Sequence, residues 1–248
     1  TMRWDGSSWQ DMGDRFAGTT PRKVNQLWRS PSGKLYAADA NQVAVYDNPE
    51  WSTLLPLEQL QQGEELTCLW GRSDSEIYAG SSLGRILRYN GSSWSEETTP
   101  AETRIAGIAG YGSNTYAVGE GGNAWRRSGG SWQQMAGIEV RENNNFLSII
   151  TAADGVYASQ TTDEGTTDGG LGRLWKFSGS TATKVLWNLS QPLEALAAAD
   201  DASLYGIGTI NGLTTIMTNA PAPDSLTLQR VDLSSTGSWT ELGQTGAA

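Results

Sequence analysis

Short apolar runs alternate with clusters of glycine, serine, asparagine and aspartate along most of the chain. Residues 66–98 show the pattern: LTCLWG at 66–71 precedes the turn RSDS, and EIYAG at 76–80 precedes the turn SSLG. RILRYN at 85–90 then precedes GSS and a polar run that begins at Trp94. Runs of this length between turn residues predict strands, and Asn-Gly before a β-prone run predicts a hairpin. The segment is therefore predicted to form four short antiparallel strands.

Two elements of this pattern recur along the chain. A Tyr-Ala or Tyr-Gly pair returns at intervals of 38 to 48 residues, with its tyrosine at Tyr36, Tyr78, Tyr116, Tyr157 and Tyr205. A turn followed by tryptophan also returns, at Trp9, Trp51, Trp94, Trp132 and Trp239, with Trp187 as a looser member. Periods of roughly 20 to 50 residues are typical of repeat architectures. Because the five tryptophans recur in register, we expect them to pack the repeats together.

Four strands in each of several repeats predict an all-β fold, a β-propeller built from four-stranded antiparallel blades. A single domain spanning 1–248 is expected to hold a half-unit at 1–12 and blade-like units at 23–57, 66–100, 104–137, 146–189 and 193–243. Five blades are preferred, and the half-unit leaves six as the alternative. A β-sandwich is a third interpretation, but nothing in a sandwich requires this repeat.

The repeats resemble those of bacterial, mostly exported, propeller proteins. LWGRSDSEIYAGSSLGRILRYNGSSW at 69–94 and TYAVGEGGNAWRRSGGSW at 115–132 carry the resemblance. The first copy departs from it, with Arg29 where the pattern has glycine, and the last two copies lack the Trp-Gly pair. The resemblance implies an extracellular or surface-associated binding protein. Similarity to the tachylectin-like five-bladed lectins is limited to architecture, since none of their motif matches residue by residue.

Composition narrows the possible functions. The chain has no histidine and one cysteine, Cys68, which argues against a Ser-His-Asp relay, an internal disulfide and a cysteine-based zinc site. A formal charge of −10 without any basic run argues against nucleic acid as a partner. No segment approaches the roughly 18 apolar residues of a membrane span. The opening TMRWDGSSWQ is polar, unlike a signal peptide, so an extracellular location would need an export signal outside this sequence.

Aromatic side chains outside the hairpin register are the candidate ligand contacts. Trp28 and Trp70 end the predicted innermost strands, and Arg29 and Arg72 lie beside them in LWRS and LWGR. An arginine next to an aromatic ring can hold a carboxylate or a sugar hydroxyl. Trp125 and Trp175 complete the predicted ligand-binding set. Packing in the core and exposure in a turn are the alternative roles for these tryptophans and arginines.

An expanded loop, SQTTDEGTTDGGLG at 159–172, contains Asp163, Glu164 and Asp168. These carboxylates could gather around calcium, which prefers oxygen ligands. No EF-hand spacing is present, so a surface loop is the preferred interpretation, and no cofactor is otherwise expected.

The sequence thus predicts a non-catalytic binding module that recognises carbohydrate or a cell surface, as in phage or virion attachment. A scaffold for protein assembly is one alternative. A glycan-processing enzyme of the sialidase or polysaccharide lyase type is another, although no residue marks a catalytic site.

Overall fold

The computed structural model describes residues 2–4, 7–11, 23–47, 50–162, 171–189, 192–198, 203–210, 213–218, 227–233 and 239–242. The chain divides into two units, residues 1–105 and 106–248. Among the described residues, helical structure is limited to two short 3-10 turns, η1 (Leu57–Gln59) and η2 (Glu120–Gly122). The all-β class predicted from the sequence is confirmed.

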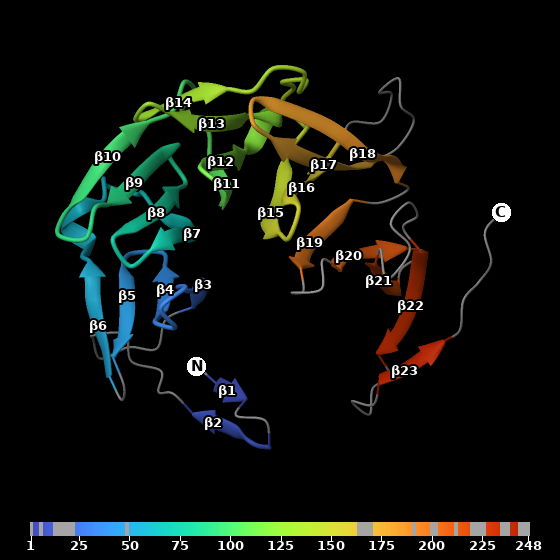
Figure 1. Ribbon diagram of the computed structural model, residues 1–248, viewed down its shortest axis with the longest axis horizontal. Helices are drawn as coiled ribbons and strands as arrows, with labels where there is room; N and C mark the ends of the chain where they lie inside the picture. The colour runs from blue at the N-terminus through green and yellow to red at the C-terminus, as the bar shows by residue number, and fades with distance from the viewer. Residues whose placement is uncertain are drawn as a thin grey trace. The chain divides into compact units, whose positions relative to one another are not determined.

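The first unit contains a hairpin and two four-stranded antiparallel sheets (Figure 1). The hairpin pairs β1 (Met2–Trp4) with β2 (Trp9–Asp11). The first sheet contains β3 (Val24–Arg29), β4 (Leu35–Asp39), β5 (Val43–Asp47) and β6 (Glu50–Leu55). The second sheet contains β7 (Leu66–Ser73), β8 (Glu76–Ser81), β9 (Arg85–Tyr89) and β10 (Trp94–Thr98). In both sheets consecutive strands pair, and β7–β10 confirm the four strands predicted for 66–98.

Three sheets follow from Ile105 onward. The first contains β11 (Ile105–Tyr111), β12 (Asn114–Gly119), β13 (Ala124–Ser128) and β14 (Ser131–Gln134). The next contains β15 (Phe146–Ala152), β16 (Gly155–Thr161), β17 (Gly172–Ser178) and β18 (Thr181–Leu189). The last has five strands in sequence order, β19 (Leu193–Ala198), β20 (Leu204–Ile210), β21 (Leu213–Thr218), β22 (Thr227–Leu233) and β23 (Trp239–Leu242). Its fifth strand exceeds the predicted four because β22 pairs both with β21 and with β23.

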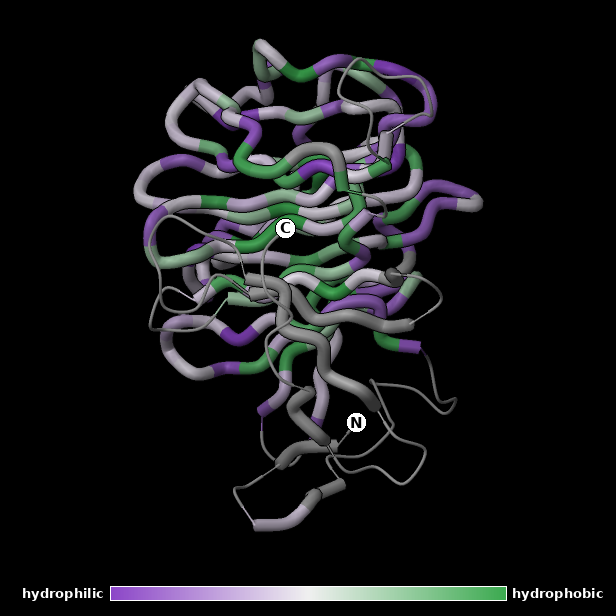
Figure 2. The backbone as a smooth tube through the Cα atoms, turned by 90° about the vertical axis from the view of Figure 1, so that its right-hand side faces the viewer, coloured by the Kyte–Doolittle hydropathy of each residue, from purple (hydrophilic) through white to green (hydrophobic). Residues whose placement is uncertain are grey.

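The core of the first unit lies where its two sheets pack together. Tyr36, Val43 and Leu55 of the first sheet belong to one buried cluster with Leu66, Leu69, Ile77 and Leu87 of the second. Hydrophobic residues follow the strands and hydrophilic residues gather at the turns (Figure 2). Cys68 lies on β7 and is also buried. Burial of one face of each sheet against its neighbour stabilises both sheets.

A close approach between β3 and β7 depends on a glycine. A Cβ atom at Gly71 would lie 2.5 Å from Cη2 of Trp28, so only glycine leaves room for this ring. The Trp28 ring also packs on Tyr36, with ring centroids 5.1 Å apart. Trp28 therefore helps to join the two sheets.

The second unit repeats this packing with other side chains. Tyr116 and Val118 of β12 form a buried cluster with Phe146, Val156 and Phe177 of the following sheet. The Tyr116 hydroxyl donates to the carbonyl oxygen of Gly179 at 2.9 Å. Leu174 of that sheet in turn contacts a cluster with Leu193, Leu196 and Leu204.

The recurrent aromatic residues occupy packing positions. Tyr36, Tyr78 and Tyr116 are buried, as are Trp51 and Trp132. Trp94 is half-buried, and its Nε1 donates to the Leu54 carbonyl oxygen of the preceding sheet at 3.0 Å. The packing role predicted for these three tryptophans is confirmed. Trp9 and Trp239 lie on strands, but their side chains are outside the described residues.

Candidate functional site

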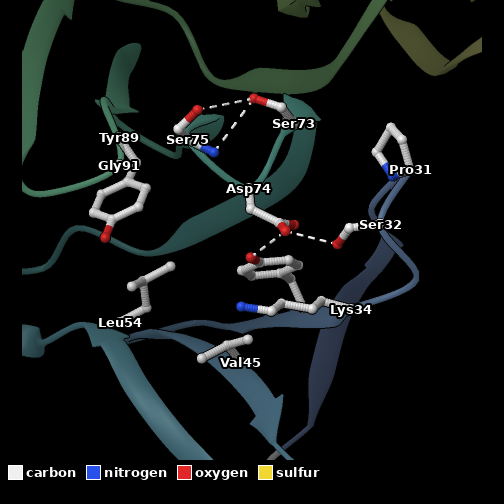
Figure 3. Close-up of a pocket in the computed structure, with 11 residues that line it drawn as sticks. Pro31, Ser32, Lys34, Val45, Leu54, Ser73, Asp74, Ser75, Tyr89 and Gly91 are labelled. Atoms are coloured by element: carbon white, nitrogen blue, oxygen red, sulfur yellow. Dashed lines mark hydrogen bonds between the residues drawn. The ribbon is translucent and has the colours of Figure 1, made fainter.

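A pocket of about 740 Å³ lies between the two sheets of the first unit (Figure 3). We call it the turn pocket, because the β3–β4 turn contributes Pro31, Ser32 and Lys34 and the β7–β8 turn contributes Ser73, Asp74 and Ser75. Strand residues and a residue of the β9–β10 turn complete its lining: Tyr36, Val45, Leu54, Tyr89 and Gly91. Its volume falls within the range of roughly 300 to 1,000 Å³ typical of ligand pockets.

The first of these turns is shaped by a glycine and by backbone hydrogen bonds. Gly33 has a φ of +93°, which other residues rarely adopt. The Ser30 N–H donates to the Lys34 carbonyl oxygen at 2.8 Å, and the Gly33 N–H donates to the Ser30 carbonyl oxygen at 2.9 Å. This turn fixes the backbone that carries Ser32 and Lys34 to the pocket.

Asp74 joins the two turns across the sheet boundary. The Ser32 hydroxyl donates to its Oδ2 at 2.6 Å, and the Tyr36 hydroxyl donates to its Oδ1 at 3.0 Å. Desolvation tends to raise the pKa of Asp74, but hydrogen bonds from Ser32, Ser30 and Tyr36 and the charge of Lys34 together lower it below its ordinary value. Asp74 therefore remains an ionised acceptor at neutral pH.

Tyr36 supplies the complementary donor. Desolvation, followed by the hydrogen bond to Asp74 and its negative charge, raises the pKa of Tyr36 above its ordinary value of 10.0. The hydroxyl thus keeps its proton throughout the neutral range. A protonated phenol and an ionised carboxylate make a charge-assisted hydrogen bond, which is stronger than one between neutral groups.

The rest of the turn pocket combines an apolar surface with further polar groups. Val45 and Leu54 contribute aliphatic side chains, while Lys34 contributes an exposed ammonium group. Tyr89 is half-buried and packs on Trp94, with ring centroids 5.3 Å apart. The lining can therefore contact both the carbon skeleton and the polar groups of a small ligand.

Of the predicted ligand contacts, Trp28 and Arg29 lie on β3, outside the turn pocket lining. Trp28 is half-buried, and its ring covers Gly71 and contacts Tyr36. Arg29 is exposed at the end of the strand.

Trp70 and Arg72 lie together on β7. The Arg72 guanidinium carbon is 5.6 Å from the Trp70 ring centroid, and Arg72 Nε is 3.7 Å from a carboxylate oxygen of Glu76. Trp70 in turn stacks on Tyr78, with ring centroids 6.2 Å apart. The structure brings this predicted pair together. Their contacts are with Glu76 and Tyr78 of the β7–β8 hairpin, outside the lining of the turn pocket.

Trp125 and Trp175 are placed differently from the other candidates. Their exposed fractions are 0% and 3%, and Trp175 Nε1 donates to Gln160 Oε1 at 2.9 Å. Their rings fill the interior of the second unit because both are on inward-facing strand positions, so neither ring offers a face for a ligand to stack on. The predicted calcium ligands Asp163, Glu164 and Asp168 lie outside the described residues.

The sequence interpretation missed Lys34, Asp74 and Tyr89. A signal was present, because SPSGK at 30–34 and RSDS at 72–75 occupy equivalent turns of consecutive repeats. Equivalent turns of neighbouring sheets meet at one edge, so polar residues in both are expected to share a surface. Finding this surface requires knowing which sheets pack side by side, and counting the repeats along the sequence does not give that.

A second, smaller hollow of about 330 Å³ in the first unit is lined by Gln61, Arg85, Glu96 and Glu102, among others. Arg85 contacts the buried carboxylate of Glu64, and its Nη2 lies 2.9 Å from Glu96 Oε2. These contacts neutralise the charges within the sheet. Among the described residues, no group of three or more cysteine, aspartate or glutamate side chains could hold a metal ion, and no helix is long and apolar enough to cross a membrane.

No protein-family model matches the sequence, and no curated protein is significantly similar to it. Solved structures do match. A catalytically inactive variant of virginiamycin B lyase from Staphylococcus aureus, with quinupristin, has a TM-score of 0.64 at 12% identity, over 86% of this chain and 74% of the other. YCF48 bound to D1 peptide has a TM-score of 0.58 at 14% identity, over 83% of this chain and 68% of the other.

The extracellular domain of a proposed one-component system from B. thetaiotaomicron has a TM-score of 0.63 at 13% identity. The alignment covers 93% of this chain and 30% of the other, so this chain spans less than a third of the length of that protein. Identities this low show a shared fold and not a shared activity. The repeated four-stranded antiparallel sheets and these matches together show that the chain has a β-propeller fold.

Proposed function

We propose that this protein is a non-catalytic binding module that recognises carbohydrate through the turn pocket. The observation that carries the proposal is the lining of this pocket. Hydroxyl groups of Ser32, Ser73 and Tyr89, the Lys34 ammonium and the Asp74 carboxylate surround a space open to solvent. Sugars present alternating hydroxyl groups and C–H faces, and they are bound by such mixtures of polar groups and apolar surface.

The proposal includes a location outside the cell or on its surface. It is supported by the resemblance of the repeats to exported propellers and by the fold shared with an extracellular domain. A net charge of −10 without any basic run also argues against nucleic acid as the ligand.

The test is a glycan array followed by calorimetric titration of the sugars that bind. Ser75→Trp would fill the turn pocket from its exposed rim, and it is expected to weaken binding at least about tenfold, a change of about 1.4 kcal/mol. Ser113→Trp is the matched control, because Ser113 is exposed in the equivalent turn between β11 and β12, outside the pocket lining.

The proposal predicts binding by the parent protein and by Ser113→Trp, with the recovered glycans chemically unchanged. Absence of any glycan binding, or equal binding by both variants, would overturn it. Release of shortened or unsaturated glycans would overturn its non-catalytic part.

A further inference from the structure

The hydrogen-bonding groups of the turn pocket are not equally available to a ligand. Both oxygens of Asp74 already accept hydrogen bonds, from Ser32 and from Tyr36. The hydroxyl groups of Ser73 and Ser75 lie 3.2 Å from each other, and the Ser75 N–H also donates to Ser73. Asp74 therefore binds the β7–β8 turn to the first sheet, and the serine pair stabilises the β7–β8 turn itself.

Lys34 is the cation of the pocket. Its ammonium group has no hydrogen bond or ion pair to any residue that the structure describes, although it acts electrostatically on Asp74. The side chain extends toward the space beside Leu54 and Val45 (Figure 3). Its three N–H donors are therefore available to a ligand in the pocket.

Tyr89 is the second available donor. Its ring packs on Trp94, which orients the side chain, and its hydroxyl points into the pocket toward Leu54 (Figure 3). Within the described part of the chain, this hydroxyl has no hydrogen-bond partner. Lys34 and Tyr89 thus present a cation and a neutral donor around the aliphatic side chain of Leu54.

A ligand group that fits this arrangement is an anion attached to an apolar face. We infer that the turn pocket prefers a carboxylated sugar, such as a uronic acid residue, to the corresponding neutral hexose. The carboxylate would accept hydrogen bonds from Lys34 and Tyr89, and the C–H face of the sugar ring would lie on Leu54 and Val45. This inference rests on the proposed carbohydrate-binding function.

The negative charge of Asp74 limits where such an anion can lie. Both oxygens of Asp74 accept hydrogen bonds from hydroxyl groups of Ser32 and Tyr36, whereas the Lys34 ammonium lies toward the aliphatic side chains of Leu54 and Val45. An anion beside Lys34 is therefore attracted more strongly than it is repelled. Charge-assisted hydrogen bonds are about twice as strong as neutral ones, so the carboxylate gains more than a hydroxymethyl group in the same place.

The test is calorimetric titration with short oligomers of glucuronate and of galacturonate, each beside its neutral glucose or galactose counterpart. We expect one acidic oligomer to bind at least about tenfold more tightly than its neutral counterpart. Lys34→Met should remove this preference while changing the affinity for the neutral oligomer less than about twofold, and Lys34→Arg should retain it. Lys23→Met is the control, because Lys23 is exposed outside the pocket lining and its loss changes the net charge equally.

The outcomes separate this inference from the function on which it rests. Equal binding of acidic and neutral oligomers, or a preference that Lys34→Met leaves intact, would overturn the inference and leave carbohydrate binding standing. If no glycan on the array and none of the four oligomers binds, the proposed function is overturned as well.

Discussion

The recurrent tyrosines share a packing role, but their hydroxyl groups have different partners. Tyr36 donates to Asp74 of the next sheet, whereas Tyr78 donates to Glu76 of its own sheet. Tyr116 donates to the Gly179 carbonyl oxygen, and Tyr157 donates to Asp154. The ring is therefore the repeated part of this residue, and the acceptor of its hydroxyl hydrogen bond differs from one repeat to the next. Only the Tyr36–Asp74 pair contributes to the turn pocket.

Replacing Asp74 tests this pair through pH. The lowered pKa of Asp74 means that the folded protein holds the ionised carboxylate more strongly than the unfolded chain does. Its contribution to stability is complete above about pH 4 and is lost as the pH falls through the folded-state pKa. We expect Asp74→Asn to lower the thermal unfolding midpoint by roughly 2–4 °C at pH 7, the shift typical of losing about 1 kcal/mol.

The difference between Asp74→Asn and the parent should shrink as the pH is lowered toward 3, in unfolding curves followed by circular dichroism. Asp47→Asn is the control, because it removes an exposed carboxylate at the end of β5, outside the pocket lining. A difference that does not change with pH would contradict the assigned ionisation of Asp74.

Between elements, glycines on some strands leave room for a side chain of the neighbouring sheet. Gly71 of β7 receives the Trp28 ring of β3, and Gly107 of β11 receives Ile149 of β15, with 2.5 Å between an added Cβ and the nearest carbon in both cases. The absence of a side chain on one strand thus makes room for a large side chain on the other. Trp28 and Trp70 each also face the recurrent tyrosine on the neighbouring strand.

Substitution of Gly71 tests this complementarity. Gly71→Ala should lower the free energy of unfolding by about 1–2 kcal/mol, because the added methyl group meets the Trp28 ring. In a Trp28→Leu background the same substitution should cost at least about 1 kcal/mol less, since the ring is gone. Denaturant titration of the four proteins measures this coupling. Strictly additive effects would show that the two residues do not contact each other in solution.

Trp94 tests the outer part of the same sheet boundary. Trp94→Ala removes its ring from Tyr89 and its hydrogen bond to Leu54, and should cost about 3 kcal/mol. Trp94→Phe keeps an aromatic ring but not the Nε1 donor, and should cost about 1 kcal/mol. Urea unfolding measures the free energy of unfolding of both variants. If Trp94→Ala lowers it no more than Trp94→Phe does, the ring has no packing role.

The elements could be predicted from the sequence much better than the site could. Strands are specified locally, by the turn residues that flank LTCLWG and EIYAG, so the strands of residues 66–98 were predicted closely. The position of Trp125 and Trp175 outside the hairpin register predicts ligand contacts, yet both side chains are buried in the core. Which face of a strand is covered depends on the neighbouring sheet, and the turn pocket likewise requires turns from two repeats to meet. Neither property belongs to any single repeat.

At the scale of the whole molecule, the sheets repeat, but the inner turns that the structure describes differ from one sheet to the next. The inner turn of the second sheet has Asp74, whereas the equivalent turn between β11 and β12 has Gly112 and Ser113. The β15–β16 turn has Asp154, but this carboxylate binds Lys176 and Tyr157 within its own sheet. The repeat therefore maintains the sheets, and differences among these turns set the turn pocket apart from the two equivalent turns.

Hydrogen exchange of the whole chain tests this localisation. With a bound sugar at saturating concentration, backbone amides near residues 30–36, 73–75 and 89–91 should gain protection, because these segments line the turn pocket. Amides of the β11–β12 and β15–β16 turns should exchange at the same rate with and without sugar. Protection confined to residues 106–248 would place the binding site elsewhere and contradict the proposed one.

The buried cysteine of β7 has a practical consequence. Cys68 is the chain's single thiol, it is 2% exposed, and burial raises its pKa to about 11. Thiolates are the reactive form, so alkylating reagents should modify this position only when the second sheet opens. Alkylation of Cys68 should therefore report opening of that sheet, and a thiol-reactive dye should label a cysteine introduced on the surface while Cys68 is still present.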